Sequence, residues 1–248
     1  MRRYWWSEPI DENEEKINIE GEVFKHIFKV CRRKAGDQFE LLNANKAFLV
    51  QVLDVEKKQA LVEIKSSRPI KALKKPHIHL VLSFSQPKVI DKVLEKSVEL
   101  GVKSLQLVST QNSFLKDQKA FETKKKRLEK IVTQALQQCG RGESFDLKAS
   151  SSIGGFLENF SAKSHAQGFM FYEGNTEAFL GLLESSKDLK TVEDIYILIG
   201  SEGGFTEEES RVAQKSGFNV LSLGDQILRV ETACVASISI LKSSFGVW

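Results

Sequence analysis

Short apolar and alternating runs, separated by turn residues, occupy the N-terminal part of the chain. Phe39–Leu42, Ala47–Val55 and Ala60–Ile64 are of strand length, and Gly, Asp, Asn and Lys lie between them. This spacing predicts short strands of a small β-barrel. Apolar residues at helical spacing predict one short helix over Gly21–Val30. Residues 68–76 contain two of the four prolines and four cationic residues, which is typical of a linker between domains.

After this linker the pattern changes to an alternation of strands and amphipathic helices. Apolar runs predict strands at His79–Phe84, Ser104–Val108, Phe145–Lys148, Gly168–Tyr172, Ile195–Ile199 and Val220–Leu223. Helical spacing predicts helices at Val89–Leu100, Phe121–Cys139, Ile153–Phe160, Thr176–Leu183, Glu207–Ser216 and Thr232–Phe245. Such alternation favours an α/β fold with a mostly parallel sheet that helices cover on both faces. We therefore expect two domains, residues 1–72 and 73–248.

Two glycine turns follow strands of this second domain. The first is Gly200–Phe205, with three glycines in five positions, and the second begins at Gly224. Thr206 and Glu209 after the first turn predict a capping box at a helix start. Ligands of parallel α/β sheets bind beyond the carboxyl ends of the strands, where both turns lie. The glycines let a backbone approach a ligand closely and expose its N–H groups.

Composition and charge exclude several classes of protein. The three cysteines are isolated, so neither a disulfide framework nor a zinc site is predicted. This cysteine usage indicates a reducing, cytoplasmic compartment. No apolar run is long enough to span a membrane, and the N-terminus lacks the apolar stretch of a secretory signal. Residues 1–75 hold 16 Lys and Arg against 12 Asp and Glu, which suits a polyanion-binding module. Ordinary surface lysines explain this excess equally well.

The polar residues of the glycine turns are the candidate chemistry. The spacing is neither that of a dinucleotide-binding motif nor that of a P-loop. Glu202 lies in the first turn, and Arg229, Glu231 and Thr232 lie at the second. A half-buried arginine needs an anionic or carbonyl partner, so a ligand or an Arg–Glu pair that only ties loop to helix would satisfy it. The histidines indicate neither a metal site nor a catalytic triad.

Several segments resemble the ribosomal RNA uridine-N3 methyltransferases called the RsmE family, within the knotted SPOUT superfamily. Leu198–Phe205 (LIGSEGGF) is similar to that family's LIGPEGGF, and Leu223–Ala233 (LGDQILRVETA) to its LGxxILRxETA. The other similar segments are Lys92–Val102, Ala135–Arg141 (ALQQCGR) and His26–Asp37. The resemblance spans nearly the whole chain.

The chain departs from the family pattern at five positions. Ser201 occupies a position where the family usually has a proline, and Gln137 one where it usually has a glutamate. Asp225 and Gln226 stand for a common Pro-Arg pair, and Val230 for a threonine. Loss of an arginine at Gln226 would weaken a substrate contact, whereas the retained Arg229, Glu231 and Thr232 favour activity.

The resemblance implies a fold, a cofactor and a partner. It implies an α/β domain with a trefoil knot whose loops hold S-adenosylmethionine, and an N-terminal PUA-like β-barrel that binds RNA. It implies a homodimer with the active site at its interface, and no metal. The expected substrate is one uridine of 16S ribosomal RNA in the small ribosomal subunit, in the cytoplasm.

The resemblance also assigns site residues. Arg229 would stabilise the uracil anion, and Glu231 or Glu202 would take its proton, unless these carboxylates only orient the arginine or cap the helix. The cofactor-binding candidates are Tyr172, Glu173, Ile199, Gly200, Gly203, Gly204, Leu223, Gly224, Ile227, Leu228 and Thr232. The RNA-binding candidates are Arg2, Arg3, His26, Arg32, Arg33 and Arg141, with Arg141 reaching across the dimer.

Two alternatives stay open at this point. The same knotted architecture carries ribose 2′-O methyltransferases, so the methylated atom would then be a ribose oxygen. A non-catalytic RNA-binding assembly factor is the third hypothesis, which the departures at Ser201 and 225–230 keep open. Binding of S-adenosylmethionine would separate this factor from both enzymes.

Overall fold

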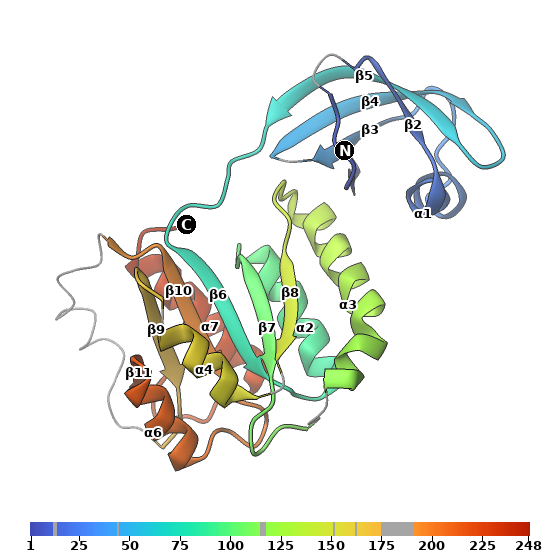
Figure 1. Cartoon of the computed structure of the whole chain (residues 1–248). Coiled ribbons are helices and arrows are strands. Elements are labelled where there is room, and N and C mark those ends of the chain that lie inside the picture. The colour runs from blue at the N-terminus through green and yellow to red at the C-terminus, as the bar shows by residue number, and fades with distance from the viewer. Residues whose placement is uncertain (12–13, 44, 115–117, 151, 162, 175–190) are drawn as a thin grey trace. The chain divides into compact units, whose positions relative to one another are not determined.

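The computed structural model describes residues 1–11, 14–43, 45–114, 118–150, 152–161, 163–174 and 191–248. The described chain separates into two units, both visible in Figure 1, which we treat one at a time. The first unit contains Met1–Ala72 and Leu136–Ser144, and the second contains Leu73–Ala135 and Phe145–Trp248. The predicted helix over Thr176–Leu183 lies outside the described residues.

The first unit is a five-stranded sheet in the order β1-β3-β4-β5-β2. Its strands are β1 (Arg3–Trp5), β2 (Lys16–Ile19), β3 (Gln38–Asn43), β4 (Lys46–Val55) and β5 (Ala60–Pro69). The pattern of apolar runs correctly predicted β3, β4 and β5. It missed β1 and β2, because strands of three and four residues are too short to show an alternating pattern.

The predicted helix of the first unit is present, but it is not a single α-helix. One α-helical turn, α1 (Gly21–Phe24), continues directly into a π-helix, η1 (Lys25–Val30). Phe24 and Phe28 stack on one another at 5.2 Å between ring centroids, and Phe28 meets Phe39 of β3 edge-on. These aromatic contacts bury the helix against the sheet, and they form part of the core of the unit.

A short segment from the second half of the chain belongs to the first unit. This segment, Leu136–Ser144, contains the end of helix α3 (Gln118–Cys139) and the turn after it. The N–H of Asn45, between β3 and β4, donates to the carbonyl of Gly142 at 3.3 Å. A Cβ on Gly142 would lie 2.7 Å from the Asn45 Cα, so the two backbones pass in close contact. A glycine is therefore needed at this crossing.

The second unit is built on a six-stranded parallel sheet in the order β11-β9-β10-β6-β7-β8. Its strands are β6 (His77–Ser83), β7 (Ser104–Val108), β8 (Asp146–Ser150), β9 (Ala166–Phe171), β10 (Asp194–Ile199) and β11 (Phe218–Leu221). Besides α3, the helices are α2 (Pro87–Glu99), α4 (Ile153–Ser161), α6 (Glu207–Lys215) and α7 (Val230–Ser244). The predicted α/β fold with a parallel sheet is confirmed.

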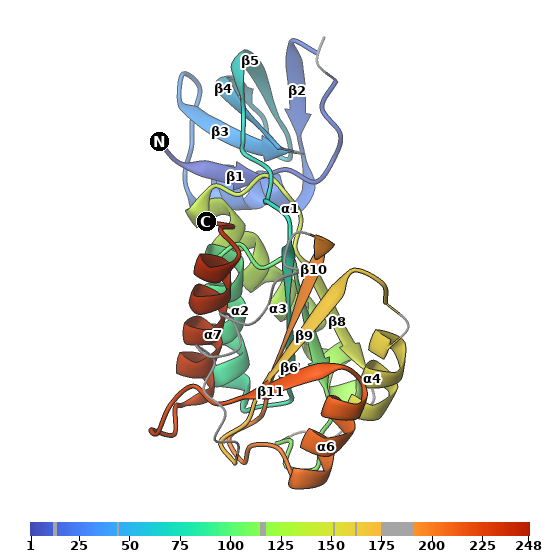
Figure 2. The ribbon, with the colours of Figure 1, turned by 90° about the vertical axis from the view of Figure 1, so that its left-hand side faces the viewer.

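Helices cover both faces of this sheet. Figure 2 shows α2 and α7 on one face and α4 and α6 on the other. On the α4 and α6 face, Val81, Met170 and Leu198 of three neighbouring strands share one buried cluster with Phe156 and Phe160 of α4. Burial on both faces explains why the strands read as nearly continuous apolar runs.

The α2 and α7 helices are also joined at their C-terminal ends. The ammonium group of Lys242, near the end of α7, donates to the carbonyl of Leu100, the residue that caps α2, at 2.8 Å. The same group lies 4.5 Å from the centre of the Trp248 ring. Among the residues that the structure describes, no helix is long and apolar enough to cross a membrane.

A polar cluster lies at the opposite edge of the sheet from the glycine turns. His79 of β6 bonds the Ser104 hydroxyl through Nδ1 at 2.7 Å and the Asp194 carboxylate through Nε2 at 2.9 Å, and its ring stacks on Tyr196. Burial lowers the pKa of His79, although the hydrogen bond to Asp194 opposes this effect. The cluster ties the first residues of β7 and β10 to β6.

We expect His79 to make the protein less stable in mild acid. Because its pKa is lower in the folded state than the value of about 6.5 in an unfolded chain, the unfolded state binds a proton that the folded state does not. The free energy of unfolding therefore falls as the pH drops below about 6.5. Urea unfolding at pH 7 and pH 5 should show a smaller loss for His79→Gln than for the wild type. Equal losses would contradict this assignment.

Candidate active site

The carboxyl ends of three neighbouring strands border the first pocket. The pocket encloses about 530 Å³ of space, open solvent included. Its lining comes from the ends of β9 and β10, from the two glycine turns and from the first residues of α7. The lining residues are Phe171, Tyr172, Glu173, Ile199, Gly200, Ser201, Gly204, Ser222, Leu223, Gly224, Gln226, Ile227, Leu228, Val230 and Ala233.

Two glycine positions of the first turn leave no space for a side chain. Gly204 has a φ of +64°, in the left-handed region, and a Cβ there would overlap the Glu173 carboxylate. A Cβ on Gly200 would lie 3.1 Å from the Gly204 backbone. The turn therefore presents bare backbone to the pocket, as the sequence predicted.

Hydrogen bonds hold the first turn against the loop that follows β7. The Ser201 hydroxyl donates to the carbonyl of Asn112 at 2.6 Å, and the Asn112 amide donates to the carbonyl of Gly203 at 2.9 Å. Ser201 is one of the departures from the family pattern, and this bond gives its hydroxyl a structural role. The predicted capping box is also present: Glu209 N–H donates to Thr206 Oγ1 and Thr206 N–H to the Glu209 carboxylate.

The second glycine turn leads directly into α7. Gly224 has a φ of +116°, and the Ser222 hydroxyl accepts its N–H at 3.2 Å. Ile227 is 86% exposed although it lines the pocket. The helix begins at Val230 with Arg229 as its N-cap, two residues earlier than the predicted start at Thr232. The periodicity of apolar residues did not show this, because polar Glu231 and Thr232 follow Val230 before the apolar positions resume.

A second cavity adjoins the first and shares six lining residues with it. It encloses about 920 Å³, open solvent included, and it lies between the start of α2, the first glycine turn and the start of α7. The three predicted catalytic residues, Arg229, Glu231 and Glu202, all line it. Gln86 and Val89 at the start of α2 line it too, and the sequence analysis missed both.

Two of the three carboxylates of this cavity, the predicted catalytic glutamates, already have partners. Glu231 bonds its own backbone N–H in the first turn of α7, and Lys92 of α2 lies 3.4 Å away. These contacts lower the pKa of Glu231, with the backbone hydrogen bond as the largest cause. Glu202 Oε1 accepts the Gln86 N–H at 3.0 Å. The two glutamates thus connect α2 to α7 and to the first turn.

Most of the predicted cofactor-binding residues border the first pocket. Nine of them line it: Tyr172, Glu173, Ile199, Gly200, Gly204, Leu223, Gly224, Ile227 and Leu228. Gly203 and Thr232 are not part of the lining, and a Cβ on Gly203 would instead meet the Asn112 side chain. Phe171 and Ser222 also line the pocket, and the sequence analysis missed both. Their positions at the ends of predicted strands could have identified them.

The six predicted RNA-binding residues all lie in the first unit, in different environments. Arg2 and Arg32 are exposed, and Arg32 follows the π-helix with a φ of +54°. His26 is half-buried, with its ring edge-on to Tyr4. Arg33 lies 3.7 Å from Asp37.

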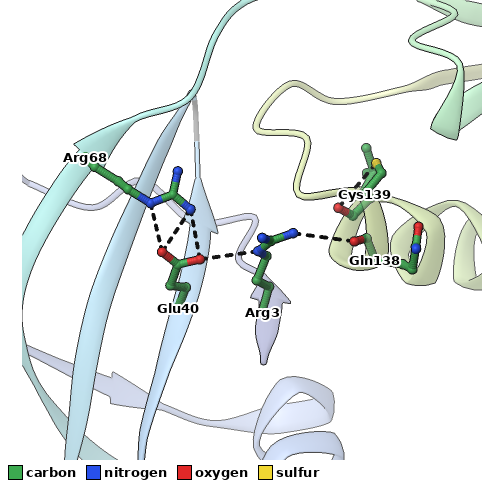
Figure 3. Close-up of polar contacts among 6 residues, drawn as sticks. Arg3, Glu40, Arg68, Gln138 and Cys139 are labelled. Atoms are coloured by element: carbon green, nitrogen blue, oxygen red, sulfur yellow. Dashed lines mark hydrogen bonds and ion pairs between the residues drawn. The ribbon is translucent and has the colours of Figure 1, made fainter. Parts of the chain in front are cut away.

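The side chains of Arg3 and Arg141 make contacts within the first unit. Figure 3 shows Glu40 between Arg3 and Arg68, with the Arg3 Nη1 directed to the carbonyl of Gln138 at 3.5 Å. Arg141 is only 8% exposed, and its Nη2 donates to the carbonyl of Ser144 at 3.0 Å. The reach of Arg141 across a dimer stays a prediction.

Within the described part of the chain, no group of three or more His, Cys, Asp and Glu residues has the arrangement of a metal site.

Family profiles match both halves of the chain. A profile described as an RNA methyltransferase domain matches residues 73–242, and one described as an RNA methyltransferase PUA domain matches residues 19–65. A ribosomal RNA small subunit methyltransferase E from Buchnera aphidicola is 33% identical over 225 residues, which cover 89% of this chain and 85% of that protein. The protein of the same name from Helicobacter pylori J99 is 29% identical over 92% of this chain and 95% of its own.

Solved structures show the same fold. A Legionella pneumophila protein described as a methyltransferase, in complex with bound SAM, has a TM-score of 0.85 and 28% identity over 98% of each chain. A ribosomal RNA small subunit methyltransferase E from Neisseria gonorrhoeae has a TM-score of 0.81 and 24% identity, over 98% of this chain and 97% of that chain.

Proposed function

We propose a specific function for this chain, which belongs to the ribosomal RNA small subunit methyltransferase E family. The proposed reaction transfers a methyl group from S-adenosylmethionine to N3 of one uridine in 16S ribosomal RNA. The observation that supports it most is the pairing of two cavities, a glycine-lined pocket and a neighbouring cavity that holds Arg229. We further propose that residues 1–72 form a PUA-like RNA-binding domain and residues 73–248 the methyltransferase domain.

The first pocket fits the proposed cofactor. It lies at the carboxyl ends of β9 and β10 and is lined by both glycine turns, where a Cβ on Gly204 would displace the Glu173 carboxylate within the lining. Backbone groups of Leu223, Ile227 and Leu228 would hold the adenine edge, and their apolar side chains would cover its faces. When bound, S-adenosylmethionine supplies a methyl group that its positive sulfur activates for transfer.

Arg229 is the proposed catalytic cation. The N3 of uracil becomes a strong nucleophile only when it has lost its proton, and the negative charge then spreads onto the two carbonyl oxygens. Arg229 lines the second cavity at the N-terminus of α7, where the helix dipole adds further positive potential. N3 then attacks the methyl carbon, and the electrons of the broken carbon–sulfur bond stay on sulfur.

We assign different roles to the two glutamates. Glu231 has a lowered pKa and an ion pair with Lys92, so it suits orienting Arg229 better than accepting a proton. Glu202 uses Oε1 for the Gln86 N–H and keeps its second oxygen for the proton of N3. Glu202 is therefore the proposed general base.

The exposed cations at the end of the π-helix are the proposed RNA contact. Arg32 and Lys34 follow the helix and Lys29 lies in its last turn, and all three are exposed. We expect the double variant Lys29→Ala/Arg32→Ala to bind small ribosomal subunits about 10-fold more weakly at physiological salt, because phosphate contacts supply most of such affinity. Filter binding across a salt series would also show a shallower salt dependence. S-adenosylmethionine binding should be unchanged, and subunit binding equal to that of the wild type would contradict this assignment.

We propose a homodimer formed through α7. Val235 and Ile240 of α7 are each 36% exposed, and Ile227 beside the pocket is more exposed still. A partner copy would cover these apolar side chains. Sedimentation of the wild type and of a Val235→Glu/Ile240→Glu variant tests this, since the variant should sediment as a monomer.

A methylation assay tests the proposed function. The protein would be incubated with labelled S-adenosylmethionine and small ribosomal subunits that lack the modification, and the nucleosides identified by mass spectrometry. We expect 3-methyluridine. A ribose-methylated nucleoside would overturn the assignment to N3, and binding of the subunit without any methyl transfer would favour an assembly factor. A substrate within the ribosomal subunit implies action in the cytoplasm.

A further inference from the structure

Gln86 lies at the entrance of α2 in a fixed backbone position. It is the N-cap residue of that helix, and Pro87 follows it at the first helical position. Its N–H donates to Glu202 Oε1 at 3.0 Å, which ties it to the first glycine turn. The side chain makes no capping bond to the helix, is exposed and lines the second cavity. The structure thus holds the backbone of Gln86 while its amide group has no partner among the described residues.

The second cavity offers few hydrogen-bond donors on its side chains. The carboxylates of Glu173, Glu202 and Glu231 only accept when ionised. The hydroxyl hydrogen of Ser201 is already donated to the carbonyl of Asn112. Among the described lining residues, this leaves the guanidinium of one arginine and the amide of one glutamine as side-chain donors.

Those donors match the edge of a uracil anion. Uracil has a carbonyl oxygen on each side of N3, so after N3 loses its proton the whole edge accepts hydrogen bonds. Two donors on either side of N3 would hold the base and spread its charge. Cytosine differs at one of these positions, where it carries an amino group that donates. The apolar side chains of Val89, Leu228 and Val230 in the same cavity suit the faces of a planar ring.

We infer that Gln86 is a specificity-determining residue, whose side-chain NH2 group donates to O4 of the uracil while Arg229 donates to O2 on the other side of N3. This inference rests on the proposed function, because it assumes that the second cavity receives the target base. Gln86 favours uracil when its NH2 group donates to O4, because cytosine carries an amino donor at that position and would need the amide to turn and present its oxygen. An acceptor in its place would reverse that match.

The test exchanges the donor for an acceptor of the same shape. Gln86→Glu and Gln86→Ala would be assayed with small ribosomal subunits that carry either uridine or cytidine at the target position. Gln214→Glu is the matched control, since Gln214 is exposed on α6 and lies outside both cavities. S-adenosylmethionine affinity, measured by calorimetry, reports whether each variant folds with an intact first pocket.

We expect Gln86→Glu to lower kcat/KM for uridine about 10–100-fold, the loss of one directed hydrogen bond to a base. The ratio of uridine to cytidine methylation should fall by at least about 10-fold in this variant, while S-adenosylmethionine affinity stays within twofold. Gln86→Ala should lose uridine activity with a smaller change in that ratio, and Gln214→Glu should match the wild type.

Two results would overturn the inference. One is a kcat/KM for uridine in Gln86→Glu equal to that of the wild type. The other is an equal loss for both bases, which would show that Gln86 only supports the start of α2. Failure of the proposed function is distinguishable, because the wild-type protein would then methylate neither base.

Discussion

Arg229→Ala should lower kcat for methyl transfer about 10²–10³-fold and leave the fold intact. Removal of one positioned donor that stabilises a developing anion costs a rate factor of this size. Arg229 is exposed at the N-cap of α7, so its truncation removes no buried contact. Single-turnover methylation of small ribosomal subunits with saturating S-adenosylmethionine measures the effect on the chemical step.

A matched arginine separates this effect from a general loss of positive charge. Arg211 is exposed on α6, where it pairs with Glu207 and Glu208, and it lines neither cavity. Arg211→Ala should keep wild-type turnover. If Arg229→Ala bound S-adenosylmethionine normally and turned over at the wild-type rate, Arg229 would have no catalytic role.

Gly204→Ala should weaken S-adenosylmethionine binding about 10–100-fold. Two effects add at this position. The φ of +64° costs an L-residue about 1–2 kcal/mol, and the new Cβ would overlap the Glu173 carboxylate, which must move within the pocket lining. Isothermal titration calorimetry measures the affinity, and urea unfolding measures the cost to stability.

Two further variants resolve these effects. Gly204→Ala/Glu173→Ala removes the steric overlap and keeps the backbone strain, so it should recover part of the lost stability. Gly154→Ala on α4 is the control, because a Cβ there meets nothing within 4 Å. It should leave cofactor affinity unchanged and slightly raise stability, since alanine is the better helix former. Unchanged cofactor affinity in Gly204→Ala would contradict the placement of the cofactor in this pocket.

The chemistry of the second cavity depends on contacts that no local pattern shows. Glu202 and Glu231 were predicted as candidates for the base, but their sequence neighbours do not reveal that Gln86 and Lys92 of α2 bind them. More than 100 residues separate each pair along the chain. The Lys92–Glu231 pair forms only when α2 packs on α7, and the Gln86–Glu202 bond only when the start of α2 reaches the first glycine turn. The order of strands decides which helices share a face.

The domain boundary was also only partly predictable from the sequence. The linker around Arg68–Pro76 is visible as a change of composition, and the two units do separate at Ala72 and Leu73. The return of Leu136–Ser144 to the first unit was not predictable, because within its helix that segment reads as one more amphipathic turn. Its place depends on the close approach of Gly142 to Asn45, a contact between distant parts of the chain. The trefoil knot stays a prediction.

The sequence by itself determined the α/β class, most strands and helices and the two glycine turns. These features follow from local physics, since burial sets the period of apolar residues and a tight turn demands glycine. Only the tertiary structure decided that β9 lies between β10 and β11, which brings both turns and Glu173 around one pocket. It also decided that α2 faces α7 and so adds Gln86 to the second cavity. Strand order and helix packing arise from the burial of the whole core, and no short window of sequence contains that information.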